Sequence, residues 1–275
     1  MTKITTLALA IVFSIAMHAQ KSQSPYEWDW TKDGIWTGAA LGGTVGGFLL
    51  IQNKDDLTEA EFAAEIANQD NINFIDKWAV GNHSESANMV SDIPFFLSFA
   101  APIGLLFDDE TNDHTAQVLG LYLESMATTG AMYTITAGLV NRSRPYVYDD
   151  SGDTTLRRRM SSNGQRSFYS GHVAATATAT FFTAKVLTDF NPEMKGQALV
   201  WTGAAVIPAA VGYFRIQGGQ HFLTDVLLGY GLGAVTGYLV PELHKTENTN
   251  VSLYPTGGIN LVGDEYKAMA VRYTF

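Results

Sequence analysis

Two histidines in this 275-residue chain stand next to groups that could handle a phosphate or another oxyanion. The stretch from Arg215 to Asp225 reads R-I-Q-G-G-Q-H-F-L-T-D, so His221 and Asp225 are four residues apart. In a helix that began near His221 the two side chains would share a face, and the carboxylate could orient the imidazole. Arg215 would add a forked donor for phosphate oxygens. The stretch alone fits an oxyanion site and a structural His–Asp pair at a helix start equally well.

Two other stretches could complete such a site. Ser170-Gly171-His172 stands directly before a run rich in alanine and threonine, so Ser170 or Gly171 would cap a helix and His172 would lie in its first turn. Further upstream, a proline ends another apolar helix and leaves Arg142 and Arg144 at its end. The helix macrodipole alone would explain an arginine there. Histidines and arginines at several predicted helix ends, however, favour a shared anion site.

The elements that must position these residues are mostly helical. Apolar stretches with many small residues predict six long helices, at about 34–51, 93–107, 115–140, 172–187, 197–215 and 221–240. A short amphipathic helix is expected near Thr58 and Glu61, which have capping-box spacing. Beyond Pro241 the pattern changes to short strands at 251–254, 259–262 and 266–275. We therefore expect an all-α, six-helix bundle with a short C-terminal antiparallel β segment.

Composition limits the partners and the compartment. A net charge of −10 argues against nucleic acid, which requires a dense basic surface. The chain has no cysteine, which excludes disulfides, thiolate nucleophiles and cysteine-bound metals. Residues 1–19 resemble a signal peptide with cleavage after Ala19, or alternatively an uncleaved anchor. We expect a signal peptide at 1–19, a helical domain at 20–245 and the β segment at 246–275, in a protein exported to the periplasm or cell envelope.

The three motifs together carry a family resemblance. The motifs are Arg144-Pro145, Ser170-Gly171-His172 and Arg215-x5-His221-x3-Asp225. In order and spacing they are similar to the three-part motif of the type 2 phosphatidic acid phosphatase (PAP2) superfamily, which includes bacterial acid phosphatases and vanadium haloperoxidases. The resemblance covers about 34–240, and the third motif is its most specific part. It implies that the bundle is PAP2-like and that 20–245 is a phosphatase domain.

The resemblance also implies a role for each motif residue. His221 would be the nucleophile that attacks phosphorus, and Asp225 would hold its imidazole in the reactive tautomer. His172 would protonate the departing alkoxide and then activate water. Five groups would meet the charge on the phosphate oxygens: Arg144, Arg215, Ser170, the backbone amide of Gly171 and, as a substitute, Arg142. This scheme requires no metal ion and no other cofactor.

One departure from the family's pattern concerns the phosphate cations. A lysine usually stands seven residues before the arginine of the first motif, and this chain has Ala137 there. Arg142, or one of Arg157, Arg158 and Arg159, would have to supply the missing charge. The departure leaves open a PAP2-like scaffold or lipid-binding protein with weak or no activity. A vanadate-dependent haloperoxidase is a further alternative, because the same pocket could hold vanadate as a phosphate mimic, but the missing lysine would normally contact that ion and so counts against it.

The expected activity is metal-independent hydrolysis of phosphomonoesters or diphosphates, including lipid or isoprenoid phosphates. The partner would be a phosphorylated small molecule or lipid. Membrane insertion is an open question from the sequence alone. Many of the apolar stretches are short for a bilayer, which needs about 20 apolar residues. The stretch at 172–187 is also rich in alanine and threonine, which enter lipid less readily than leucine.

Overall fold

The computed structural model describes residues 24–246, 251–259 and 265–273. A mostly helical chain with a small β segment is confirmed, whereas the expected signal peptide at 1–19 lies outside the described residues. The described helices are α2 (Lys32–Gln52), α3 (Glu59–Ala67), α4 (Glu85–Gly104), α5 (Asp109–Asn112), α6 (Thr115–Leu139), α7 (Leu156–Met160), α8 (Gly171–Phe190), α9 (Gln197–Gln217) and α10 (Leu223–Leu243). Short 3₁₀ turns lie at Gln69–Asn71, Lys77–Ala79, Leu105–Phe107, Pro145–Tyr148 and Ser162–Gln165.

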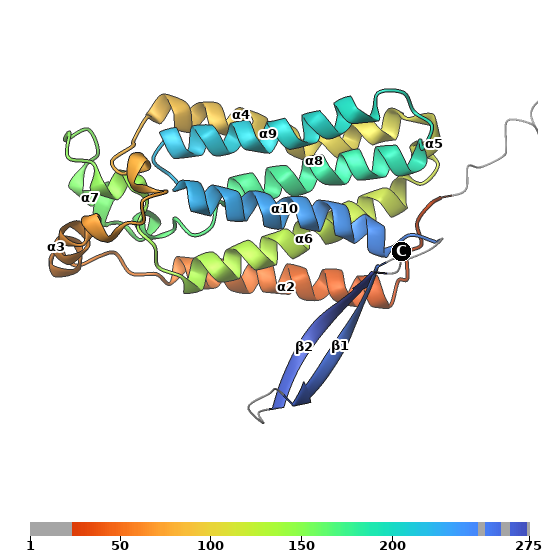
Figure 1. Ribbon diagram of the computed structural model, residues 1–275, viewed down its shortest axis with the longest axis horizontal. Helices are drawn as coiled ribbons and strands as arrows, with labels where there is room; N and C mark the ends of the chain where they lie inside the picture. The colour runs from red at the N-terminus through yellow and green to blue at the C-terminus, as the bar shows by residue number, and fades with distance from the viewer. Residues whose placement is uncertain (1–23, 247–250, 260–264, 274–275) are drawn as a thin grey trace, which may run out of the picture.

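The long helices lie alongside one another, and α3 and α7 gather at one end of them (Figure 1). We call this end, with the loops at 53–84 and 140–170, the cap end. α2 packs on α6, whereas α4, α9 and α10 all pack on α8. Most side chains of α8 are buried, and the majority of them are alanine, threonine and valine. Because these side chains are small, neighbouring helices can approach α8 closely, and α8 forms the inner element of the bundle.

A seam of glycines joins α10 to α8. Gly233 and Gly237 face backbone carbonyl oxygens of α8, and Gly229 faces that of Ser170, the residue directly before α8. A Cβ atom on Gly233 would lie 2.1 Å from the carbonyl oxygen of Ala174, and the other two positions are almost as tight. Because only glycine permits this approach, the seam fixes the beginning of α8 beside the beginning of α10.

Capping residues set the beginnings of two cap-end helices. The predicted capping box of α3 is confirmed, since the Thr58 hydroxyl accepts from the Glu61 amide (3.3 Å) and the Glu61 carboxylate accepts from the Thr58 amide (2.8 Å). α4 begins at Glu85, about two turns before the predicted start near 93. The hydroxyl of Ser84 caps it there by accepting the amide of Ala87 (3.2 Å).

The C-terminal segment is a two-stranded antiparallel sheet of β1 (Val251–Ile259) and β2 (Glu265–Tyr273). The expected break after 254 is wrong, because 255–258 belong to β1 and Pro255 pairs in register with Met269. Each strand of a two-stranded sheet has an open edge, which tolerates a proline. The sheet follows α10 at the end of the bundle opposite the cap end (Figure 1). An isolated bridge between Tyr26 and Lys245 joins the segment before α2 to the end of α10.

Four helical segments of the described chain are long and apolar enough to cross a membrane: α2, 85–107, α9 and α10. Large apolar side chains on their outer faces are exposed, among them Phe48, Phe96, Leu199 and Leu227. The second of these segments is longer than the sequence indicated, because α4 begins before the predicted start. The length objection to membrane insertion therefore does not hold for these four segments.

Candidate active site

His172, His221, Arg144 and Arg215 come together at the cap end, where α8 begins and α9 ends. Burial lowers the pKa of both imidazoles, and the positive charges of Arg215 and Arg144 lower them further. The pKa of His172 falls to about 3 and that of His221 falls well below its ordinary value. At neutral pH both imidazoles are therefore uncharged, beside two arginine cations.

A backbone carbonyl fixes the tautomer of His221. Its Nδ1 lies 2.6 Å from the carbonyl oxygen of Ser167. Because a carbonyl oxygen only accepts hydrogen bonds, Nδ1 carries the proton and Nε2 keeps its lone pair. An unprotonated Nε2 is the form of the imidazole that can attack an electrophilic phosphorus.

Asp225 is linked to His221 through Ser167. α10 begins at Leu223, so His221 precedes the helix and the predicted one-turn relation with Asp225 is not formed. Asp225 instead accepts the amide of Phe222 (3.0 Å) and the hydroxyl of Ser167 (2.6 Å). The expected direct contact between Asp225 and His221 is absent from the hydrogen bonds of the described residues. In its place the carboxylate holds Ser167, whose carbonyl holds the imidazole.

The structure does not support Arg142 as a phosphate cation. Its guanidinium lies between two carboxylates, 2.7 Å from Asp76 and in a close hydrogen bond to Asp225. Burial alone would raise the pKa of Asp76, but hydrogen bonds from Thr224 and Asn73 hold it below its ordinary value, so the carboxylate is charged. Arg142 also lines a cavity of about 440 Å³ whose wall includes neither histidine of the site. Its charge is thus used to position Asp225.

The other suggested substitutes for the missing lysine lie on α7, and one of them, Arg158, is close enough to Arg144 for the two charges to repel. Arg158 pairs with Glu85 (3.4 Å), and Arg159 donates to a backbone carbonyl (2.7 Å). Arg157 is exposed. Ala137 is itself fully buried in α6 and supplies no charge to the site.

Several buried donors of the site have no hydrogen-bond partner among the described residues. They are Nε of Arg144, Nε of Arg215 and Oγ of Ser170, together with Nε of Arg166, a residue that the sequence did not single out. An unmet buried polar group costs about 1–3 kcal/mol, so such groups nearly always have a partner. Gly171 adds a backbone amide at the first position of α8, where helices leave amides free. This donor set suits a tetrahedral oxyanion.

Asp92 and Asn88 of α4 are site residues that the sequence did not reveal. The carboxylate of Asp92 lies 3.3 Å from Nε2 of His172 and 3.8 Å from Arg215. Asn88 accepts a hydrogen bond from Arg215 (2.7 Å), and the ring of Phe95 packs on His172 with centroids 4.1 Å apart. The predicted helix start near 93 left Asn88 and Asp92 in a loop. The sequence signal that could have revealed them is Ser84, which caps α4 and places its start at Glu85.

An apolar groove reaches the same region from the side of the bundle. Its volume is about 480 Å³, and residues of α2, α6 and α10 line it, including Trp36, Met132 and Leu232. Its wall also includes Tyr169, the residue directly before Ser170. The groove therefore connects the outer face of the helices with the segment that carries the oxyanion donors.

Comparisons with known proteins agree with the motif pattern. Residues 118–249, which contain all three motifs, match the model of the PAP2 superfamily. A relative, the lipid A 4'-phosphatase of Porphyromonas gingivalis, is 28% identical over 103 residues, or 38% of this chain. The match spans only 40% of the length of that relative. The transmembrane PAP2-type phosphatidylglycerolphosphate phosphatase of Bacillus subtilis has a TM-score of 0.46 and 25% identity over 76% of this chain and 98% of its own. Over 118–249, just under half of its length, this chain is therefore similar to the PAP2 superfamily.

Proposed function

We propose that this protein is a membrane-bound phosphoric ester hydrolase that removes phosphate from lipids through a phosphohistidine intermediate. The observation that carries the proposal is the fixed tautomer of His221, whose Nδ1 is held 2.6 Å from a carbonyl oxygen while Nε2 stays free. Beside burial, the positive charges of Arg144 and Arg215 lower the pKa of this imidazole and that of His172. A nucleophile, an acid and the cations for an oxyanion thus come from the three motifs.

In the first step, Nε2 of His221 attacks the phosphorus and the bond between phosphorus and the alcohol oxygen breaks. The bound phosphate offsets the charges of the two arginines, so His172 takes up a proton when substrate binds and gives that proton to the departing alkoxide. Arg144, Arg215 and Ser170 donate to the phosphate oxygens as charge develops on them. The carbonyl of Ser167 stabilises the Nδ1–H of His221, which becomes more positive as the P–N bond forms.

In the second step, water attacks the phosphorus of the phosphohistidine and gives a proton to His172. The P–N bond breaks, His221 returns to its neutral form and inorganic phosphate leaves. Asp92, 3.3 Å from His172 Nε2, stabilises the imidazolium that forms in this step. The scheme uses no metal ion or other cofactor, because arginines supply the charge and His172 supplies and accepts the proton.

Three observations support a lipid substrate. The apolar groove of about 480 Å³ reaches Tyr169 beside the oxyanion donors and has the dimensions of a small-ligand pocket. Four helical segments are suited to a membrane, which would place the outer mouth of the groove in lipid. The similar protein of Porphyromonas gingivalis acts, by its name, on the phosphate of a lipid.

A substrate comparison tests this proposal. With a chelator present, the detergent-solubilised protein is expected to hydrolyse a diacyl lipid phosphate at least about 10-fold more efficiently than an aryl phosphate, because acyl chains bind in the groove. Ala39→Phe, which adds a ring to the groove wall, should lower kcat/KM for the lipid and leave the aryl phosphate unaffected. Equal efficiency on both substrates would favour a small-molecule phosphatase. The absence of turnover from folded protein would favour the scaffold reading.

Oxyanion binding is expected to take up a proton at His172. With its pKa at about 3, the free imidazole is neutral at pH 6. A bound dianion offsets the charges of Arg144 and Arg215 and so raises this pKa. Because the bound-state pKa is the higher one, affinity should rise as pH falls through it and level off below the free-state pKa. Calorimetry of sulfate binding at pH 6 in two buffers with different ionisation enthalpies measures the uptake, which His172→Gln should abolish. The same uptake in His172→Gln would exclude this group.

A further inference from the structure

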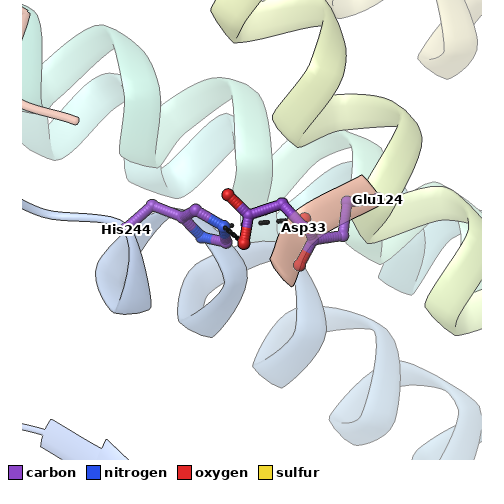
Figure 2. Close-up of side chains that lie close together, drawn as sticks. All are labelled: Asp33, Glu124 and His244. Carbon is purple, nitrogen blue, oxygen red and sulfur yellow. Dashed lines mark ion pairs between the residues drawn. The ribbon is translucent and has the colours of Figure 1, made fainter. Parts of the chain in front are cut away.

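Three potential metal ligands converge in space (Figure 2), near the start of α2 and the end of α10, which lie opposite the cap end (Figure 1). Asp33 comes from the first turn of α2, Glu124 from α6 and His244 from the residue after α10. Nε2 of His244 lies 3.2 Å from Asp33 Oδ1 and 3.6 Å from Glu124 Oε2. The three ligand atoms lie within 4.8 Å of one another.

The remaining polar atoms of two of these side chains are fixed by the backbone. Nδ1 of His244 lies 2.7 Å from the carbonyl oxygen of Val240, so Nδ1 carries the proton and Nε2 can offer a lone pair to the cluster. Oδ2 of Asp33 accepts the amide of Asp29 at 2.6 Å, which leaves Oδ1 for the cluster. Metal-binding histidines usually have this arrangement, in which the second nitrogen donates to a carbonyl or carboxylate.

One carboxylate oxygen of the cluster is buried without a hydrogen bond. Glu124 is only 5% exposed, and its Oε2 has no hydrogen-bond partner among the described residues. Oγ of Thr37, one helical turn from Asp33, is likewise buried and without a partner there. A buried carboxylate oxygen that faces a second carboxylate is costly unless a cation or a proton lies between them.

Basic side chains near this end are engaged elsewhere. Lys185 and Lys245 pair with Asp189 and Glu242, and Lys32 pairs with Asp29. Within the described residues, His244 is the basic group that forms ion pairs with Asp33 or Glu124. If its imidazole is neutral, the cluster carries two negative charges that a divalent cation would balance.

We propose that Asp33, Glu124 and His244 bind a zinc ion that fastens α2, α6 and α10 together. Zinc takes histidine nitrogen and carboxylate oxygen at about 2.0–2.2 Å, usually in tetrahedral geometry, which places neighbouring ligand atoms about 3.3–3.5 Å apart. The separations of 3.2 and 3.6 Å from the imidazole nitrogen match that geometry. Magnesium is a poorer fit, because it prefers an octahedron of oxygen ligands. Three protein ligands leave the fourth tetrahedral position to water, and the site is separate from the phosphatase residues, which lie at the cap end.

Zinc binding to the tag-free full chain in detergent tests the proposal, by competition with a fluorescent chelator after metal removal. We expect one zinc per chain and a higher melting temperature with zinc. His244→Gln and Glu124→Gln should each weaken zinc binding at least about 100-fold. This loss exceeds the usual effect of changing a residue that only hydrogen-bonds to a metal ligand. Two variants are used so that the test still holds if one of them misfolds, and circular dichroism checks that each variant is folded.

His83→Gln is the matched control. His83 also lies between two carboxylates, 3.5 Å from Asp149 and 3.3 Å from Asp153, but at the cap end. This variant and His221→Ala should bind zinc as the wild type does. Wild-type protein that binds no zinc, or equal affinity in wild type, His244→Gln and Glu124→Gln, would show that the cluster is an ordinary ion pair with a protonated imidazole.

Discussion

His221→Ala is expected to lower phosphate release by at least about 10³-fold, because it removes the atom that forms the covalent intermediate. The surrounding arginines and His172 remain, so substrate should still bind with a similar KM. Phosphate release is measured with excess lipid phosphate. Acid-quenched samples of the wild type with radiolabelled substrate should contain acid-labile phosphoprotein, and the variant should contain none.

The control for this variant is again His83→Gln, which changes a cap-end histidine outside the site. It should retain wild-type turnover and labelling. If His221→Ala loses labelling but keeps a substantial part of its turnover, the reaction proceeds by direct attack of water and the phosphohistidine step is refuted. If both variants lose activity equally, the effect comes from the stability of the cap end.

Gly233→Ala is expected to destabilise the protein by about 3 kcal/mol and to lower its melting temperature by roughly 6–12 °C. The added methyl group would meet the carbonyl oxygen of Ala174 at 2.1 Å, so α10 must move away from α8. The same movement separates His172, at the start of α8, from the loop that carries His221. Turnover should therefore fall in the protein that still folds, with kcat affected more than KM.

The same helix provides a matched control. Gly231 is exposed, and a Cβ atom there would meet no atom within 4 Å. Gly231→Ala should thus leave stability unchanged or raise it slightly, since alanine is the better helix former by about 1 kcal/mol. Thermal melts of both variants in the same detergent distinguish packing from helix propensity. Equal melting temperatures in the two variants would contradict a close contact between α8 and α10.

Much of the fold could be predicted because its signals are local. Runs of apolar and small residues gave the long helices, and the Thr58–Glu61 box gave α3. The starts of two helices could not be predicted, because they depend on which of several nearby residues caps the first free amides of the helix. Ser84 extends α4 by about two turns, and the Asp225 carboxylate defines the start of α10 after His221. The continuous strand through 255–258 was missed because a proline and two glycines usually signal a turn.

The site was predictable at the level of its motifs and less so at the level of its contacts. The motif order identified His172, His221, Arg144 and Arg215, which come together at the cap end. The partners of those residues depend on long-range contacts that sequence spacing cannot reveal. Asp92 approaches His172 from α4. Other cases are the pairing of Arg142 with Asp76 and the placement of Ser167 between Asp225 and His221.

The cap end lies at the opposite end of the bundle from the start of α2 and the end of α10 (Figure 1). In a protein that crosses a membrane, these two ends face different compartments. The chain has no cysteine, so Asp70→Cys at the cap end and Lys195→Cys at the other end would each provide a unique label. A membrane-impermeant maleimide should react with one of them in intact cells and with both after permeabilisation, whereas equal labelling in intact cells would contradict crossing. The result for Asp70→Cys would identify the compartment that receives the released phosphate.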